Sequence, residues 1–404
     1  MNGASENLRK FGWLVALVAA MCAAGWIAGL WREMQSAGPG KALDVDFAVF
    51  WGAAKLTLAQ GPLVPFDMDA LNAARSLPEG TETFPMLWLY PPGWLSLLLP
   101  FGMLSFFWAW LAFGLISFAL FAYALRRPAQ AIPGGWPLAI TAPAVLITLA
   151  LGQNSLIFAA LLVLVLEALR RQHHLLAGLL IAAMTLKPQL GLAIPVVLIA
   201  AGYWRVILWA CLGTAAIVLS SLIWPGADYW PLFFQQLKDG GDLIRQSDLV
   251  AMMTSGYGSS VMAGLDRDTA FIAQAGVSLL AAAALAWLWW SKAAYDLKAA
   301  GLAFAILLIT PYAIYYELVF AIVGVMYLAR AGALVGRPGA IFAILIWLLP
   351  VLGLLMLQGP GFAFSAPLVA LGLGIAVYSA LQSSIDDRGA PEAHGTQPKG
   401  ARHG

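Results

Sequence analysis

A single charged side chain, Lys187, lies in the middle of the almost unbroken apolar stretch 175–203 and is followed by Pro188 and Gln189. A cation at membrane depth is costly, and it persists where it faces a partner, a cavity or a substrate. Pro188 interrupts helical hydrogen bonding at this point, and interrupted backbone inside a membrane is tolerated where it lines a cavity within the protein. The pattern predicts a polar site inside a membrane, with an anion as the partner of Lys187. The alternative is a lysine whose ammonium group extends to the membrane interface.

Two carboxylates, Asp44 and Asp46, precede a segment of membrane-like composition that contains Phe47, Phe50 and Trp51. A carboxylate that is partly shielded from water has a raised pKa and is a better general base, which favours Asp46 for proton abstraction. Two alternatives stay open. Either aspartate could cap the N-terminus of the following helix, or the pair could bind a metal ion, although two carboxylates alone are a weak metal signal.

Three further motifs interrupt the apolar pattern: Tyr90-Pro91-Pro92, Gly152-Gln153-Asn154, and the segment Thr310-Pro311-Tyr312 with Tyr315-Tyr316-Glu317. Each has a purely structural interpretation. The prolines suit the first turn of a helix, the glycine suits a tight turn between two spans, and Glu317 could be an ordinary helix-end carboxylate. The alternative is that these motifs line the same site as Lys187, where Gln153 and Asn154 would hydrogen-bond the hydroxyl groups of a sugar.

The elements that must position these residues are membrane helices. Of the 404 residues, 61% are hydrophobic and 10% are charged, and the mean hydropathy is +0.82. Soluble proteins carry about a quarter charged residues. The apolar runs of roughly 20 residues predict transmembrane helices. The net charge of +2 implies no nucleic-acid partner.

Basic residues recur between the apolar runs, and placing them in the cytoplasm satisfies the positive-inside rule. This predicts an all-α polytopic membrane protein with about 12 transmembrane helices, in a range of about 10–13, and both termini in the cytoplasm. Residues 1–382 would form one membrane domain and 383–404 a disordered cytoplasmic tail. Two larger extracytoplasmic loops are expected at 32–87 and 225–267. The spans are expected at 11–31, 105–125, 134–151, 152–169, 174–187, 189–203, 204–224, 268–290, 299–311, 317–329, 339–357 and 362–382, with a half-helix at 88–104.

This topology brings every polar motif to the outer face of the membrane. A transport pathway needs polar residues near the midplane that are distributed to both sides. A site that is polar on only one side of the membrane fits binding or chemistry at the outer leaflet better than it fits transport. We therefore expect a multi-pass protein of the inner (plasma) membrane whose site faces the periplasm or the cell exterior.

The ordered set of motifs resembles glycosyltransferase family 87, which includes polyprenol-phosphate-mannose-dependent mannosyltransferases. The resemblance runs from residue 44 to about 330 and rests on Asp46 to Ala54, Phe66-Asp67, Tyr90-Pro91-Pro92, Gly152-Gln153-Asn154, Lys187-Pro188-Gln189 and Thr310 to Leu318. It implies the GT-C fold, a sugar donor carried on a polyprenyl monophosphate, and an acidic base in the first outer loop. The chain departs from the family pattern at Phe66, where Tyr is expected, and at Glu317, where Asp is expected.

Carried over to this sequence, the resemblance makes Asp46 the base of an inverting hexosyltransferase. The enzyme would transfer a mannose-like sugar from the lipid-linked donor to an extracytoplasmic lipid or glycan acceptor. Lys187 is assigned to the donor phosphate from its charge and depth. Substrate binding is expected at Asp44, Trp51, Tyr90, Gln153, Asn154, Gln189, Tyr312, Tyr316 and Glu317. No cofactor is expected, and a divalent metal ion is not indicated but stays open.

Two other functions compete with the transferase. A transporter or flippase of lipid-linked sugars would also need a lipid-accessible polar site, together with a path to the cytoplasm. A non-catalytic membrane scaffold would use the same motif residues to cap and pack helices. Use of a nucleotide sugar is not expected, because the sequence contains no Rossmann-type glycine signature.

Overall fold

A computed structural model describes residues 2–37, 41–78 and 86–389 of the chain. Within these ranges the structure contains helices and no β-strand, which confirms the all-α prediction for this part of the chain. The α-helices are α1 (Asn2–Ala37), α2 (Phe47–Gln60), α3 (Met68–Ala74), α4 (Pro92–Gly102), α5 (Phe106–Gln130), α6 (Gly135–Ile140), α7 (Pro143–Leu151), α8 (Ser155–Arg170), α9 (His174–Met184), α10 (Ile194–Ala200), α11 (Trp204–Ile223), α12 (Tyr229–Gln246), α13 (Gly256–Met262), α14 (Arg267–Trp290), α15 (Tyr295–Ile309), α16 (Val319–Arg330), α17 (Gly336–Leu355) and α18 (Ser365–Gly389). The short 3-10 helices are η1 (Val64–Phe66), η2 (Pro188–Gly191), η3 (Asp248–Met252) and η4 (Tyr315–Leu318).

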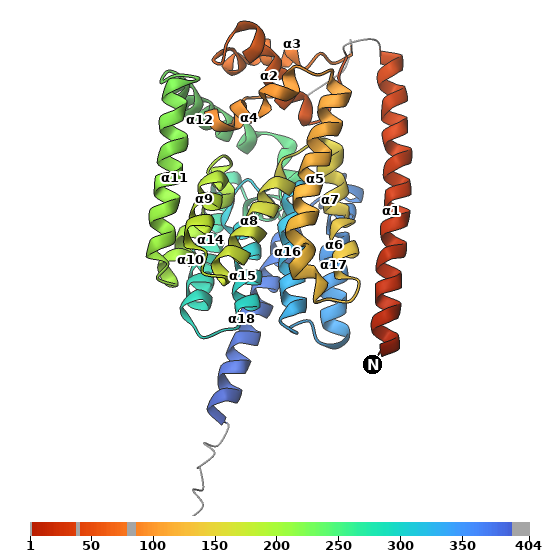
Figure 1. The fold of residues 1–404 in the computed structure, drawn as a ribbon, viewed down its shortest axis with the longest axis vertical. Coiled ribbons are helices and arrows are strands. Elements are labelled where there is room, and N and C mark those ends of the chain that lie inside the picture. The colour runs from red at the N-terminus through yellow and green to blue at the C-terminus, as the bar shows by residue number, and fades with distance from the viewer. Residues whose placement is uncertain (1, 38–40, 79–85, 390–404) are drawn as a thin grey trace, which may run out of the picture.

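The helices form a bundle with a cap at one end (Figure 1). The cap consists of α2, α3, α4 and α12, which come from the two segments predicted as large loops and from the predicted half-helix. Helix α2 packs on α3 and α4. Ten of its residues are buried, because Phe, Val, Ala and Trp occur on every side of this helix. Residues 41–78, the described central part of the first predicted loop, therefore contain packed helices.

Six helices of the described chain are long and apolar enough to cross a membrane: Arg9–Ser36, Phe106–Gln130, Trp204–Ile223, Arg267–Trp290, Gly336–Leu355 and Ser365–Ile385. The protein is therefore a multi-pass membrane protein. The remaining predicted spans correspond to shorter helices, so the count of twelve stays a prediction. Helix α18 continues to Gly389, past the predicted start of the tail at 383, while residues 390–404 lie outside the described ranges.

The helices on either side of Lys187 are among the short ones. Helix α9 has 11 residues, so it is about 16 Å long at 1.5 Å per residue. Helix α10 has 7 residues. The hydrocarbon core of a bilayer is about 30 Å thick, so neither helix is long enough to cross it alone. The segment between these two helices, which carries Lys187, therefore lies inside the protein, where Lys187 is buried.

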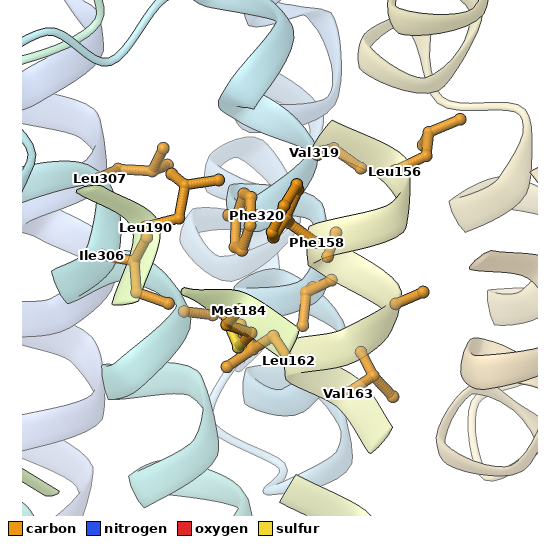
Figure 2. Close-up of a cluster of buried hydrophobic side chains, with 14 of the residues drawn as sticks. Leu156, Phe158, Leu162, Val163, Met184, Leu190, Ile306, Leu307, Val319 and Phe320 are labelled. Atoms are coloured by element: carbon orange, nitrogen blue, oxygen red, sulfur yellow. The ribbon is translucent and has the colours of Figure 1, made fainter. Parts of the chain in front are cut away.

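A dense apolar core lies next to this junction. Figure 2 shows side chains from α8, α9, η2, α15 and α16 that point toward one another, among them Phe158, Met184, Leu190 and Phe320. All four are buried. Because buried groups in such a core are close-packed and hold single rotamers, it fixes the helix ends beside it.

Helix α1 stands at the edge of the bundle, with its N-terminus at the end away from the cap (Figure 1). It contacts the bundle through aromatic pairs such as Trp26 with Trp110, whose ring centroids are 5.6 Å apart. An apolar chamber of about 630 Å³ lies between α1 and helices α5 to α7. Its wall includes the small residues Ala20, Ala23 and Gly114.

Candidate functional site

Asp46 lies where the cap meets the bundle. It occupies the N-cap position of α2, but its side chain makes no capping hydrogen bond. The carboxylate instead accepts a hydrogen bond of 2.6 Å from Nε2 of Gln153, which is 107 residues away in the sequence. The simple capping interpretation of Asp46 is therefore wrong, and the residue faces the polar turn between α7 and α8.

This turn depends on Gly152. Its φ angle of +66° lies in the left-handed region that favours glycine. A Cβ atom at this position would lie 2.4 Å from Cβ of Phe47, the residue that follows Asp46. The interpretation of the motif as a tight turn is therefore correct. The next two residues of the turn, Gln153 and Asn154, are buried, and their side-chain amides hydrogen-bond charged partners.

Lys187 is 3% exposed and does not extend to an interface. Its ammonium donates to Oδ1 of Asn154 at 3.1 Å and lies 2.8 Å from Oε1 of Glu317. It also lies 5.4 Å from the ring centroid of Tyr316. The carboxylate of Glu317 is thus an anionic partner of Lys187 within the protein, and the assignment of Lys187 to the donor phosphate stays a prediction.

Glu317 is as buried as Lys187, with 3% of its surface exposed. Its second carboxylate oxygen accepts a hydrogen bond of 3.2 Å from the backbone N–H of Ile314. That bond ties the carboxylate to its own 3-10 helix, η4. Glu317 is therefore a helix-end carboxylate that closes the first turn of η4, and it is also the buried counter-ion of Lys187.

Together these contacts make one polar chain through four distant segments. It runs from Asp46 to Gln153, continues through the adjacent Asn154 to Lys187, and ends at Glu317. We call these five residues the polar cluster. The two groups that the sequence analysis singled out, the carboxylate and the ammonium, therefore belong to one site.

Asn154 contains an unusual atom for a buried side chain. Its Oδ1 accepts from Lys187, which fixes the orientation of the amide, because an ammonium group can only donate. The other end, Nδ2, is buried without a hydrogen-bond acceptor in the described structure. The phenol of Tyr90 is close enough to the Asn154 side chain to interact with it, so this N–H group faces Tyr90 inside the cluster.

The electrostatics of the site favour a protonated phenol at Tyr90 and raise the basicity of the Asp46 carboxylate. Burial raises the pKa of Asp46 above its ordinary value, and the hydrogen bond from Gln153 and the charges of Lys187 and Arg75 oppose this rise. Burial also raises the pKa of Tyr90, and the negative charges of Asp46 and Glu317 add to that effect. Tyr90 therefore stays a neutral phenol at physiological pH and lies next to the polar cluster.

Four predicted site residues lie elsewhere or have other partners. The indole Nε1 of buried Trp51 donates to the carbonyl of Leu104 at 2.9 Å. The carbonyl of Gln189 accepts from Thr310, and its side chain is exposed. Tyr312 packs against Tyr257 in a separate apolar cluster with Val250 and Met253. Asp44 forms an ion pair with Arg75.

Arg75 is a site-proximal residue that the sequence analysis missed. It is 1% exposed, and it pairs with Asp44, two residues before Asp46. Its signal in the sequence was weak, since a lone arginine in a predicted outer loop is usually solvated. No group of three or more His, Cys, Asp or Glu side chains that could hold a metal ion occurs in the described ranges.

The candidate spans and the buried polar cluster define an integral membrane protein with a charged site where a helical bundle meets its cap. The model of glycosyltransferase family 87 matches residues 88–311, which is more than half of the chain. The protein therefore belongs to glycosyltransferase family 87, as its motifs had indicated, and is a membrane glycosyltransferase. The matched segment contains Gln153, Asn154 and Lys187, whereas Asp46 and Glu317 lie outside it. Comparisons with curated proteins and with solved structures gave no match.

Proposed function

We propose that this protein transfers a mannose-like hexose from a polyprenyl-phosphate-sugar donor to an acceptor outside the cytoplasm, with inversion at the anomeric carbon. The observation that carries the proposal is the polar cluster, in which a carboxylate and an ammonium group are connected through two adjacent amides. A transferase of this kind needs one group that accepts a proton and another that stabilises a departing phosphate. Asp46 and Lys187 are suited to these two roles.

The reaction is a direct displacement. Asp46 accepts the proton of the acceptor hydroxyl while the oxygen of that hydroxyl forms a bond to the anomeric carbon. The bond from that carbon to the phosphate oxygen breaks, and negative charge develops on the phosphate. Lys187 has three N–H donors, of which Asn154 and Glu317 accept two, so a phosphate oxygen can accept the third. Cations placed where charge develops are worth about 2.7–4 kcal/mol in comparable electrostatic cases.

The remaining polar groups suit recognition of the sugar. Nδ2 of Asn154 makes no hydrogen bond of good geometry and lies beside the Tyr90 phenol, so a sugar hydroxyl between them could accept from it. Tyr90, as a neutral phenol, can donate to a sugar oxygen. Tyr316 presents an aromatic ring beside Lys187. These contacts support a sugar-bearing ligand over a simple anion.

The chamber between α1 and the bundle suits a hydrocarbon chain. Its wall includes Trp110 and Ala150, and the Trp110 indole donates to the carbonyl of Ala150 at 3.3 Å. Ala150 lies three residues before Gln153, so the chamber and the polar cluster share the end of α7. A lipid chain in this chamber would place its headgroup beside Asp46. We assign the protein to the inner membrane, with the cap on the periplasmic or outer side.

The experiment that tests the proposal uses purified protein in proteoliposomes with a radiolabelled polyprenyl-phosphate-mannose donor. Transfer of the label to an endogenous lipid or glycan acceptor supports the transferase. Movement of intact donor across the bilayer without transfer would support the flippase instead. Wild-type levels of either activity in Asp46→Asn and Lys187→Ala variants would indicate that the cluster only packs helices.

A further inference from the structure

Arg75 is almost completely buried and closes the C-terminal end of α3. Arginine is rarely buried unless it is paired. Its guanidinium forms an ion pair with Asp44 and donates to Oδ1 of Asn72 at 3.0 Å. A planar guanidinium can hold two acceptors in a fixed geometry, which an ammonium group cannot do. Arg75 therefore joins α3 to the segment that leads into Asp46.

Asn72 extends this connection to a second segment. Its side-chain oxygen accepts from the backbone N–H of Met86 at 3.0 Å, and its side-chain nitrogen donates to the carbonyl of the same residue at 3.1 Å. Met86 lies four residues before Tyr90. The backbone N–H of Ala42 adds a further tie, because it donates to the carbonyl of Ser76 at 3.0 Å.

Helix α3 thus holds both chain segments that enter the site from the cap. One segment ends at Asp46 and the other at Tyr90. We propose that Arg75, together with Asp44 and Asn72, is a positioning residue that sets the orientation and the charge environment of the base. This inference rests on the proposed function, in which Asp46 is the base. It gives Asp44 a role in positioning in place of direct substrate binding.

The positive charge of Arg75 also acts on Asp46 directly. The charged and titratable groups that face Asp46 are Lys187, Arg75, Asp44, Tyr90, Tyr315 and Tyr316. Arg75 and Lys187 favour the ionised carboxylate, and Asp44 disfavours it. Loss of the arginine charge therefore raises the pKa of Asp46, whereas loss of the Asp44 charge lowers it. A residue that only packs the cap would move the pKa in neither of these opposite directions.

The test is a kinetic comparison of Arg75→Met, Arg75→Lys and Asp44→Asn in the proteoliposome transfer assay. We expect kcat to fall about tenfold or more in Arg75→Met and Asp44→Asn, and less in Arg75→Lys. The acid limb of the pH profile should move to higher pH in Arg75→Met and to lower pH in Asp44→Asn. The double variant Asp44→Asn/Arg75→Met should lose no more activity than Arg75→Met, because residues that act as one unit are not additive. Arg126→Met, an exposed arginine at the far end of α5, is the matched control and should keep wild-type kinetics.

The outcomes separate this inference from the proposed function. If the wild-type protein transfers no sugar, the proposed function itself fails. If the wild type transfers sugar and all three variants keep its kcat and pH profile, Arg75 is not a positioning residue. A folded variant with reduced kcat but an unmoved acid limb would also overturn the assigned electrostatic role. Should Arg75→Met fail to fold, Asp44→Asn and Arg75→Lys still decide the question, because each removes less of the buried contact.

Discussion

The ammonium of Lys187 lies 2.8 Å from a carboxylate oxygen of Glu317, and each of the two side chains is only 3% exposed. The two residues are far apart in the sequence, because Lys187 is the N-cap residue of η2 and Glu317 lies in η4. Removing one partner of a buried ion pair leaves the other charge without compensation, which costs about 3–5 kcal/mol. The pair therefore links the start of η2 to η4 as well as orienting Lys187.

This relationship predicts different effects for two substitutions of Glu317. Glu317→Ala should destabilise the protein by about 3–5 kcal/mol, because Lys187 keeps a buried charge without its partner. Glu317→Gln should destabilise it less, since the amide oxygen can still accept from the ammonium. Thermal unfolding in detergent measures both. Equal thermal midpoints for the two variants would contradict the importance of the ion pair.

The resemblance to the family leads us to expect Asp at this position, which suggests a third variant. Glu317→Asp shortens the side chain by one methylene and should draw the carboxylate away from Lys187. We expect a higher KM for the lipid-linked donor and a smaller effect on kcat, because the ammonium would lose its fixed orientation before the reaction. Steady-state kinetics with varied donor would show this. An unchanged KM would mean that η4 moves to restore the contact.

Lys187 itself is expected to stabilise the departing phosphate. Lys187→Met removes the charge while keeping much of the side-chain length. We expect kcat to fall by about 10²–10³-fold, which is the loss seen when one preorganised electrostatic contact to a developing charge is removed. Single-turnover transfer from the labelled donor measures the chemical step. A variant with wild-type single-turnover rate would exclude Lys187 from the phosphate site.

Much of this fold follows from the lengths of the apolar runs, because runs of about 20 apolar residues indicate membrane helices. Helices α5, α11, α14, α17 and α18 coincide closely with predicted spans. The site was predictable in part, since a charge inside an apolar run, as at Lys187, carries its own physical meaning. The partner was not predictable. Nothing local to Glu317 indicates that it pairs with a residue 130 positions earlier, because that contact depends on how α9 and η4 pack.

The role of Arg75 illustrates the same limit. In the sequence it is one arginine in a polar segment, and only the packing of α3 on α2 buries it. Trp51 and Tyr312 were chosen because a conspicuous residue type lies close to a motif. The structure shows the Trp51 indole bonded to the carbonyl of Leu104 and Tyr312 packed on Tyr257, and their contact with substrate stays a prediction. Residue type and proximity in the sequence do not determine the direction of a side chain.

Asp46→Asn should abolish most of the transferase activity. The amide can still accept from Gln153, so the fold and the local hydrogen bond should be kept, but it cannot take a proton from the acceptor. General-base catalysis contributes about 10²–10⁴-fold, and we expect kcat to fall by that factor. The donor KM should change little. Asp67→Asn, which alters an exposed helix cap in the same outer segment, is the control. Full activity in Asp46→Asn would show that another group is the base.

The raised pKa of Asp46 predicts the pH dependence of the reaction. The base must be ionised, so kcat/KM should fall as the pH decreases through the folded pKa of Asp46. Because burial raises that pKa, the fall should begin above the ordinary aspartate value of about 3.9. The stability effect has the opposite sign. Between the unfolded and folded pKa values the folded state binds more protons, so this group makes the protein less stable as the pH rises through that window. An acid limb at or below the ordinary aspartate value would contradict the burial of the carboxylate.

Gly152→Ala should damage both folding and catalysis, because its Cβ would press on Phe47 next to the base. A non-glycine residue in the left-handed region costs about 1–2 kcal/mol, and forcing an extra methyl group into a packed site costs about 1–3 kcal/mol more. The backbone can relieve the contact only by moving Gln153 or Phe47, and either movement shifts the hydrogen bond to Asp46. We therefore expect a lower thermal midpoint and a lower kcat in the same variant. Gly374→Ala is the matched control, since a Cβ there meets no atom within 4 Å and its φ angle is ordinary. It should leave kcat unchanged, and equal behaviour of the two variants would show that the turn tolerates a side chain and does not position the site.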